Sequence, residues 1–155
     1  MTSPAAPRLS WNDAFLLGYD PMDGTHEEFV QCVNAVQDAS DAQLPAAMDE
    51  LERHLREHFG QEDQWMRETN FPPGDCHIDE HAAVLKSVVE VRALLAQGDT
   101  NEPRRLAAAL ADWFPGHADY LDSALAQWMC KQRLGAKPVV LKRRLDFGPV
   151  PGTER

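Results

Sequence analysis

Histidines and acidic residues recur at helical spacing along this chain. His58 and Glu62 are four residues apart, and so are His77 and His81, with the turn-forming sequence FPPG at residues 71–74 between the two pairs. At about 100° per residue, a step of four places both members of a pair on one helix face. Two helices that face each other would therefore direct three imidazoles and one carboxylate to a single interior point.

Further candidate ligands precede and follow this stretch. His26 lies upstream, and His117 is followed five residues later by Asp122. Taken alone, a histidine on an apolar helix face is more often a hydrogen-bonded core residue than a ligand. Together, five imidazoles and two carboxylates buried in one small core would cost several kcal/mol of desolvation per charge without a metal ion. The joint pattern therefore indicates a metal site.

The types of ligand restrict the metal. Imidazole nitrogen and carboxylate oxygen without thiolate suit iron, manganese or zinc. This many protein ligands exceeds what one tetrahedral zinc accepts, and suits two six-coordinate ions that share bridges. The Glu-x-x-His motif of carboxylate-rich di-iron bundles does not occur in the sequence, so a histidine-rich pair of irons is favoured. The candidate ligands are His26, His58, Glu62, His77, His81, His117 and Asp122.

Periodic apolar residues predict four helices that would carry these ligands. Steps of three and four residues indicate helices near 22–38 and 41–68, a third after an Asp75 cap that ends at Gly98, and a fourth over about 102–134. No period-two stretch predicts a strand. The fold class is therefore all-α, an up-down-up-down four-helix bundle over residues 22–134, with an N-terminal arm (1–21) that we expect not to be helical and a basic C-terminal tail (135–155).

Pro115 lies inside the fourth predicted helix, two residues before His117. Proline removes one backbone hydrogen bond and tends to kink a helix. On a regular helix, the five-residue step would also place His117 and Asp122 about 140° apart, which is too wide for one shared target. We therefore predict a kink just before His117, or a local bulge, that redirects its side chain; the alternative is that Pro115 is a tolerated irregularity of the helix.

Composition and charge limit the class of protein. A chain of 155 residues with 43% hydrophobic content can bury one core without disulfides, and a net charge of −10 argues against nucleic-acid or membrane binding by the main body. Residues 131–155 differ, with seven Lys or Arg against two acidic residues; we expect a solvated tail that docks partly on the body. Three cysteines outside any CxxC motif, no signal peptide and no long apolar segment predict a soluble, cytoplasmic protein, which we expect to be a monomer.

In this order on four helices, the candidate ligands resemble the hemerythrin signature. Trp11 and residues 20–23 before His26 are similar to the bacterial branch, the bacteriohemerythrins, and the resemblance covers about residues 11–131. It implies reversible dioxygen binding, for storage, delivery or sensing, at two iron ions joined by an oxo or hydroxo bridge. It also implies that one iron is held by three histidines (His77, His81, His117) and the other by two (His26, His58), and that Glu62 and Asp122 bridge them.

The resemblance also implies a dioxygen pocket near the second iron, lined by Phe29, Phe59, Trp113, Phe114 and Ala118. Ala118 departs from the family, which usually has isoleucine after this histidine. His54 stands where the family tends to have tyrosine, and we expect it to be a partly exposed or supporting residue rather than a ligand. We expect a carrier rather than an enzyme, with an oxygen-consuming enzyme as a candidate recipient. The rivals are a di-iron peroxidase, a nitric oxide detoxifying enzyme and an iron-binding stress protein.

Overall fold

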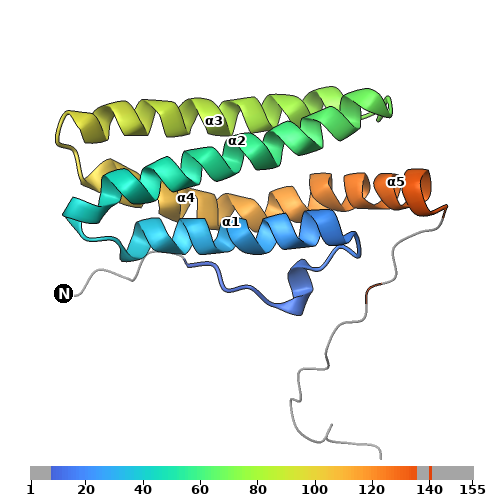
Figure 1. The fold of residues 1–155 in the computed structure, drawn as a ribbon, viewed down its shortest axis with the longest axis horizontal. Coiled ribbons are helices and arrows are strands. Elements are labelled where there is room, and N and C mark those ends of the chain that lie inside the picture. The colour runs from blue at the N-terminus through green and yellow to red at the C-terminus, as the bar shows by residue number, and fades with distance from the viewer. Residues whose placement is uncertain (1–7, 136–139, 141–155) are drawn as a thin grey trace, which may run out of the picture.

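Helices lie side by side in the computed structural model, which describes residues 8–135 and residue 140 (Figure 1). The helices α1 to α4 run in alternating directions, and α1 packs against both α2 and α4 while α3 packs against the same two. The predicted all-α, up-down-up-down four-helix bundle is confirmed. The helices are α1 (Asp20–Asp38), α2 (Leu44–Glu68), α3 (Gly74–Ala96), α4 (Asn101–His117) and α5 (Ser123–Leu134). A π-helical turn, η3 (Ala118–Asp122), joins α4 to α5, so that these three segments together form the fourth rod of the bundle.

Local sequence signals explain where the helices begin and end. A short 3-10 helix, η2 (Asp41–Gln43), leads into α2, and its capping box pairs Ser40 with Gln43. Gly98 ends α3 with a positive φ of 97°. The predicted Asp75 cap is wrong, because the Gly74 N–H already donates to the Phe71 carbonyl at 3.0 Å and α3 begins one residue earlier. Asp75 instead lies in the first turn of α3, where its negative charge interacts favourably with the positive end of the helix dipole.

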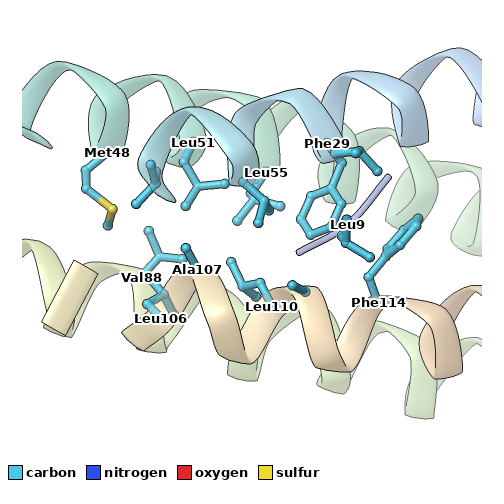
Figure 2. Close-up of a cluster of buried hydrophobic side chains, with 14 of the residues drawn as sticks. Leu9, Phe29, Met48, Leu51, Leu55, Val88, Leu106, Ala107, Leu110 and Phe114 are labelled. Atoms are coloured by element: carbon cyan, nitrogen blue, oxygen red, sulfur yellow. The ribbon is translucent and has the colours of Figure 1, made fainter. Parts of the chain in front are cut away.

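Two apolar clusters fill the bundle at different levels. The larger cluster occupies the half that contains the beginnings of α2 and α4, and includes Leu51, Leu55, Val88 and Leu110 (Figure 2). The smaller cluster lies around the beginning of α1 and the end of α2, and includes Met22, Trp65, Leu125 and Met129. These side chains are 5% exposed or less, so they form the hydrophobic core on either side of the level described below.

The segment before α1 packs against the bundle. The side chain of Leu9 is buried in the larger cluster, and its carbonyl accepts a hydrogen bond from Asn34 Nδ2 at 3.1 Å. The Asp23 carboxylate accepts hydrogen bonds from the backbone N–H groups of Leu17 (2.8 Å) and Gly18 (3.1 Å). The expectation of an arm without helix is wrong in part, because a single 3-10 turn, η1 (Asp13–Phe15), forms there.

The first helix also starts earlier than predicted. It begins at Asp20 rather than residue 22, because Pro21 falls in its first turn, where a missing N–H costs nothing. The predicted behaviour of the basic tail (135–155) falls almost entirely outside the described residues. In the part of the chain that the structure describes, no helix is long and apolar enough to cross a membrane.

Candidate metal centre

One level of the bundle, between the two apolar clusters, contains every residue predicted as a ligand. Each of these side chains is at most 4% exposed. They come from α1, α2, α3, α4 and the end of the π-helical turn, and they fall into two groups that share a carboxylate. The first group is Glu62, His77, His81, His117 and Asp122, and the second is His26, His58 and Glu62.

Three imidazoles lie around one oxygen of Asp122 and one oxygen of Glu62, and each oxygen is close to two of them. Asp122 Oδ1 lies 2.9 Å from His77 Nε2 and 3.1 Å from His117 Nε2. Glu62 Oε1 lies 3.5 Å from His77 Nε2 and 3.6 Å from His81 Nε2. We call His77, His81 and His117 the three-histidine group. Their ring nitrogens converge on the two carboxylates, as ligands of one ion would.

The two other imidazoles meet the opposite oxygens of the same carboxylates. Glu62 Oε2 lies 2.7 Å from His58 Nε2 and 3.5 Å from His26 Nε2. Asp122 Oδ2 lies 3.1 Å from His26 Nε2. We call His26 and His58 the two-histidine group. Since Glu62 and Asp122 each direct one oxygen to each group, both have the geometry of carboxylates that bridge two ions.

Unsatisfied polar atoms at this level show that the site fits metal ions. Among the described residues, both oxygens of Glu62 and Asp122 are buried without a hydrogen bond, and so are the Nε2 atoms of His26, His58 and His77. Buried polar atoms without partners are rare, and each costs free energy unless something satisfies it. Nitrogen and oxygen donors aimed at two shared points suit two ions such as iron, which would satisfy these atoms together.

The charges within the cluster also indicate that the site fits metal ions. Burial lowers the pKa of His26, but the nearby Asp122 and Glu62 carboxylates outweigh burial and raise that pKa to about 10. Burial likewise lowers the pKa of His77, and the same two carboxylates raise it to about 9. Without a metal ion, protons on these imidazoles would therefore balance the carboxylates. A bound cation would take over that role and displace the protons.

The backbone between His117 and Asp122 explains how a five-residue step serves one site. Residues Ala118–Asp122 are π-helical, and the Ser123 N–H donates to the Ala118 carbonyl, the i to i+5 pattern of this helix type. The wider turn brings residues five apart onto one face. The helix α4 continues through Pro115 to His117, so the proline does not end it, and the kink there stays a prediction. The alternative prediction, a local bulge, is confirmed, and the bulge follows the histidine.

Comparison with known proteins agrees with this geometry. Residues 17–129 match the family described as hemerythrin HHE cation binding domain. A bacteriohemerythrin from Ralstonia nicotianae is 38% identical over 126 residues, which cover 81% of this chain and 92% of that protein. The chain belongs to the hemerythrin family. The myohemerythrin of Riftia pachyptila is also similar, at 28% identity over 86 residues that cover 55% of this chain and 69% of that protein.

Membership in the hemerythrin family, bacterial branch, implies a non-haem di-iron centre in an oxygen-binding protein rather than an enzyme. The cluster of histidines and carboxylates in this hemerythrin provides the donor set that such a centre requires. All seven residues predicted from the sequence are brought together, and the structure supports their assignment as ligands, which we propose below.

Aromatic side chains surround the two groups unequally. Phe114 lies against the two-histidine group, with its ring centroid 5.3 Å from that of His26, and Phe29 packs 4.8 Å from Phe114. Phe59 stacks on His81 at 4.0 Å, and Trp113 lies 4.3 Å from His117. Phe59 also lies 5.1 Å from His58, so it contacts both groups, whereas Trp113 contacts the three-histidine group through His117.

Two other predictions concern Ala118 and His54. Ala118 is buried in the larger apolar cluster next to the centre. His54 is only 4% exposed, which excludes the partly exposed role, and its ring lies 5.2 Å from that of His58, which fits the supporting role that was the other expectation. It belongs to neither group of potential ligands. Its position one helical turn from His58 explains its burial, because the same face of α2 carries both rings.

Two carboxylates that contact the histidines were not predicted. Asp63 Oδ1 lies 2.7 Å from His81 Nδ1, and Glu80 Oε1 lies 2.9 Å from His117 Nδ1. The only signal in the sequence of this hemerythrin is that Asp63 follows Glu62 directly and Glu80 precedes His81 directly. Adjacent helical positions diverge by about 100°, so such neighbours flank a ligand face without joining it.

Proposed function

We propose that this chain binds dioxygen reversibly at a di-iron centre, for oxygen storage, delivery or sensing. One observation carries the proposal: two carboxylates are shared between a group of three imidazoles and a group of two. If Glu62 and Asp122 each give one oxygen to each ion, the ion on the two-histidine side has one protein ligand fewer than the other ion. That side is therefore where a small molecule such as dioxygen would bind.

The proposed ligands follow the two groups. His77, His81 and His117 would hold one ion and His26 with His58 the other, while Glu62 and Asp122 would bridge them, each through both oxygens. When bound, the two irons would supply one electron each for a reversible reduction of dioxygen. The protein's part is to keep the pair close together and to leave its two sides unequal.

Reversible binding also requires surroundings that withhold protons and water. Phe29 and Phe114 supply such surroundings on the two-histidine side, since both are fully buried and have no polar atoms in their side chains. Ala118 is buried in the same apolar cluster as these two rings and would complete the proposed pocket. Phe59 and Trp113 would instead fix the imidazole planes of His81 and His117.

The deciding experiment follows metal content and oxygen binding in one sample. Iron is counted per chain, the protein is reduced without air, air is admitted, and the near-ultraviolet charge-transfer bands are followed while oxygen is removed again. Two irons per chain and full return to the colourless reduced form support a carrier. Irreversible oxidation with peroxide or nitric oxide turnover would instead favour an enzyme, and one zinc per chain would exclude both.

We further propose that the protein acts in the cytoplasm as a monomer. The three cysteines, Cys32, Cys76 and Cys130, are all free, which fits a reducing compartment. Light scattering after gel filtration gives the mass of the particle in solution, and a mass of about twice that of one chain would contradict the monomer.

A further inference from the structure

The outer nitrogens of the histidines differ between the two groups: two of the three in the three-histidine group meet a carboxylate, and neither of those in the two-histidine group does. In the three-histidine group, His81 Nδ1 meets Asp63 at 2.7 Å and His117 Nδ1 meets Glu80 at 2.9 Å. The Nδ1 atoms of His26 and His58 in the two-histidine group are buried, and no hydrogen bond to them occurs among the described residues. The same holds for Nδ1 of His77, the third member of the three-histidine group. The carboxylate contacts are therefore confined to one side of the centre.

The Glu80 contact is itself held in place. Trp113 Nε1 donates to the same Glu80 oxygen at 2.8 Å, and the Trp113 ring lies 4.3 Å from that of His117. On the other helix, Asp63 follows Glu62 directly, so its position is set by the same turn of α2 that places a bridging carboxylate. The Asp63 and Glu80 side chains are 18% and 38% exposed, in contrast to the fully buried bridging carboxylates.

A carboxylate at the outer nitrogen of a metal-bound imidazole has two effects. It accepts the Nδ1–H hydrogen bond, which fixes the tautomer and the ring orientation and leaves the Nε2 lone pair for the metal. It also makes the imidazole a more basic, stronger donor. For His81 and His117 both effects would favour the ion of the three-histidine group, and they would stabilise the ferric state of that ion more than the ferrous state.

We propose that Asp63 and Glu80 are positioning residues that make the two metal positions unequal, so that the three-histidine position binds its ion more tightly and is harder to reduce than the two-histidine position. This inference rests on the proposed di-iron function and extends it. The unequal number of ligands would then be reinforced by unequal donor strength. The ion that meets dioxygen would be the one without carboxylate support at its histidines.

The test compares Asp63→Asn, Glu80→Gln and the double variant with the wild-type chain. Asp79→Asn serves as the matched control, because Asp79 is an exposed carboxylate one residue before Glu80 on α3. Ferrous ion is titrated into each metal-free chain under anaerobic conditions against a chromophoric chelator, which resolves two binding constants. We expect each single variant to weaken one of the two constants by about 10- to 100-fold and to leave the other within about threefold.

Two further measurements separate positioning from a loss of structure. In an anaerobic redox titration, the same variants should raise the potential of one iron selectively, and a tenfold shift in that equilibrium corresponds to about 59 mV for one electron. Asp63→Glu keeps a carboxylate and should recover most of the lost affinity, whereas unfolding would not be rescued in this way. Circular dichroism of each variant confirms that the bundle has formed.

The outcomes distinguish this inference from the function on which it rests. Two ions in the wild type, with one selectively weakened in the variants and neither in Asp79→Asn, support it. Two ions in the wild type with no loss, an equal loss of both, or the same loss in the control would overturn this inference alone. A wild-type chain that holds fewer than two ions overturns the di-iron proposal as well.

Discussion

His117 Nε2 lies 3.1 Å from Asp122 Oδ1, although a regular helix would point these two side chains in widely different directions. The π-helical turn between them accounts for the contact. Short π-helical segments of this kind are found frequently at functional sites. Here the turn allows a single helical rod to direct one imidazole and one carboxylate to the same part of the candidate centre.

Deletion of Tyr120 tests whether the turn is one inserted residue in an otherwise regular helix. Tyr120 is 82% exposed and lies within the turn, so its removal costs little packing. We expect the shortened turn to become α-helical, with His117 and Asp122 four residues apart on one face, and two metal ions to be retained. Deletion of the exposed Gln127 in α5 is the control, and should rotate the residues after it and destabilise the fold. Loss of metal in the Tyr120 deletion alone would contradict this account.

Glu62→Gln tests the bridging role of that carboxylate. The amide has nearly the same shape, but its nitrogen cannot replace the second oxygen that faces the other histidine group. We expect the number of tightly bound ions to fall from two per chain to one or none, as measured by elemental analysis after dialysis. Glu68→Gln, in the exposed last turn of α2, should keep both ions. Retention of two ions by Glu62→Gln would show that the centre can hold both ions without both carboxylate oxygens of Glu62.

Ala118→Ile tests the access of solvent to the proposed pocket. The larger side chain should shield the two-histidine side, so we expect slower autoxidation of the oxygenated form, followed by the decay of its absorption bands. Because Ala118 is only 2% exposed, overpacking is expected to cost about 1 to 3 kcal/mol of stability. Ala118→Val should show smaller changes of the same sign. Unchanged or faster decay in both variants would exclude solvent access as the determinant.

The metal-free protein should lose stability as the pH rises. The carboxylates of the cluster overcome the effect of burial and raise the pKa of His26 to about 10 and that of His77 to about 9, whereas an unfolded histidine has a pKa of about 6.5. The stabilisation from these protons is therefore complete below about pH 6.5 and is lost as the pH rises through about 9 to 10. Thermal unfolding of the chelator-treated protein should show a Tm that falls over this range.

The metal-loaded protein provides the comparison for this pH dependence. Metal ions that replace these protons should remove most of the loss of stability at alkaline pH. Metal loading near pH 7.5 should release protons into a weakly buffered solution, and an indicator dye measures that release. A metal-free Tm that stays constant between about pH 6.5 and pH 10 would show that the two imidazoles are not protonated in the folded state.

The helical pattern and the ligand positions could be predicted because both depend on local spacing. Four-residue spacing alone predicts a shared helix face for His58 with Glu62 and for His77 with His81. The π-helical turn could be anticipated only as an inconsistency between the step from His117 to Asp122 and a regular helix. Spacing does not encode how α5, which follows the turn, packs in the smaller cluster.

Contacts between helices were beyond prediction for a different reason. Asp63 reaches His81 and Glu80 reaches His117 across helix boundaries, so these contacts depend on how the helices are rotated against one another. A single sequence does not contain that rotation. Phe59 illustrates the same limit, because its adjacency to His58 in the chain predicts the 5.1 Å separation of those two rings but not the stacking on His81 of the next helix.

The span of the centre along the chain has a thermodynamic consequence. His26 belongs to the first helix and Asp122 to the end of the last turn before α5, and both would bind the same ion. Such an ion is a reversible cross-link that closes a loop of nearly 100 residues. In the chain-entropy model, a permanent cross-link of this size restricts the unfolded chain by about 4 to 5 kcal/mol. Iron availability would then set how long the folded chain lasts, as well as whether it carries oxygen.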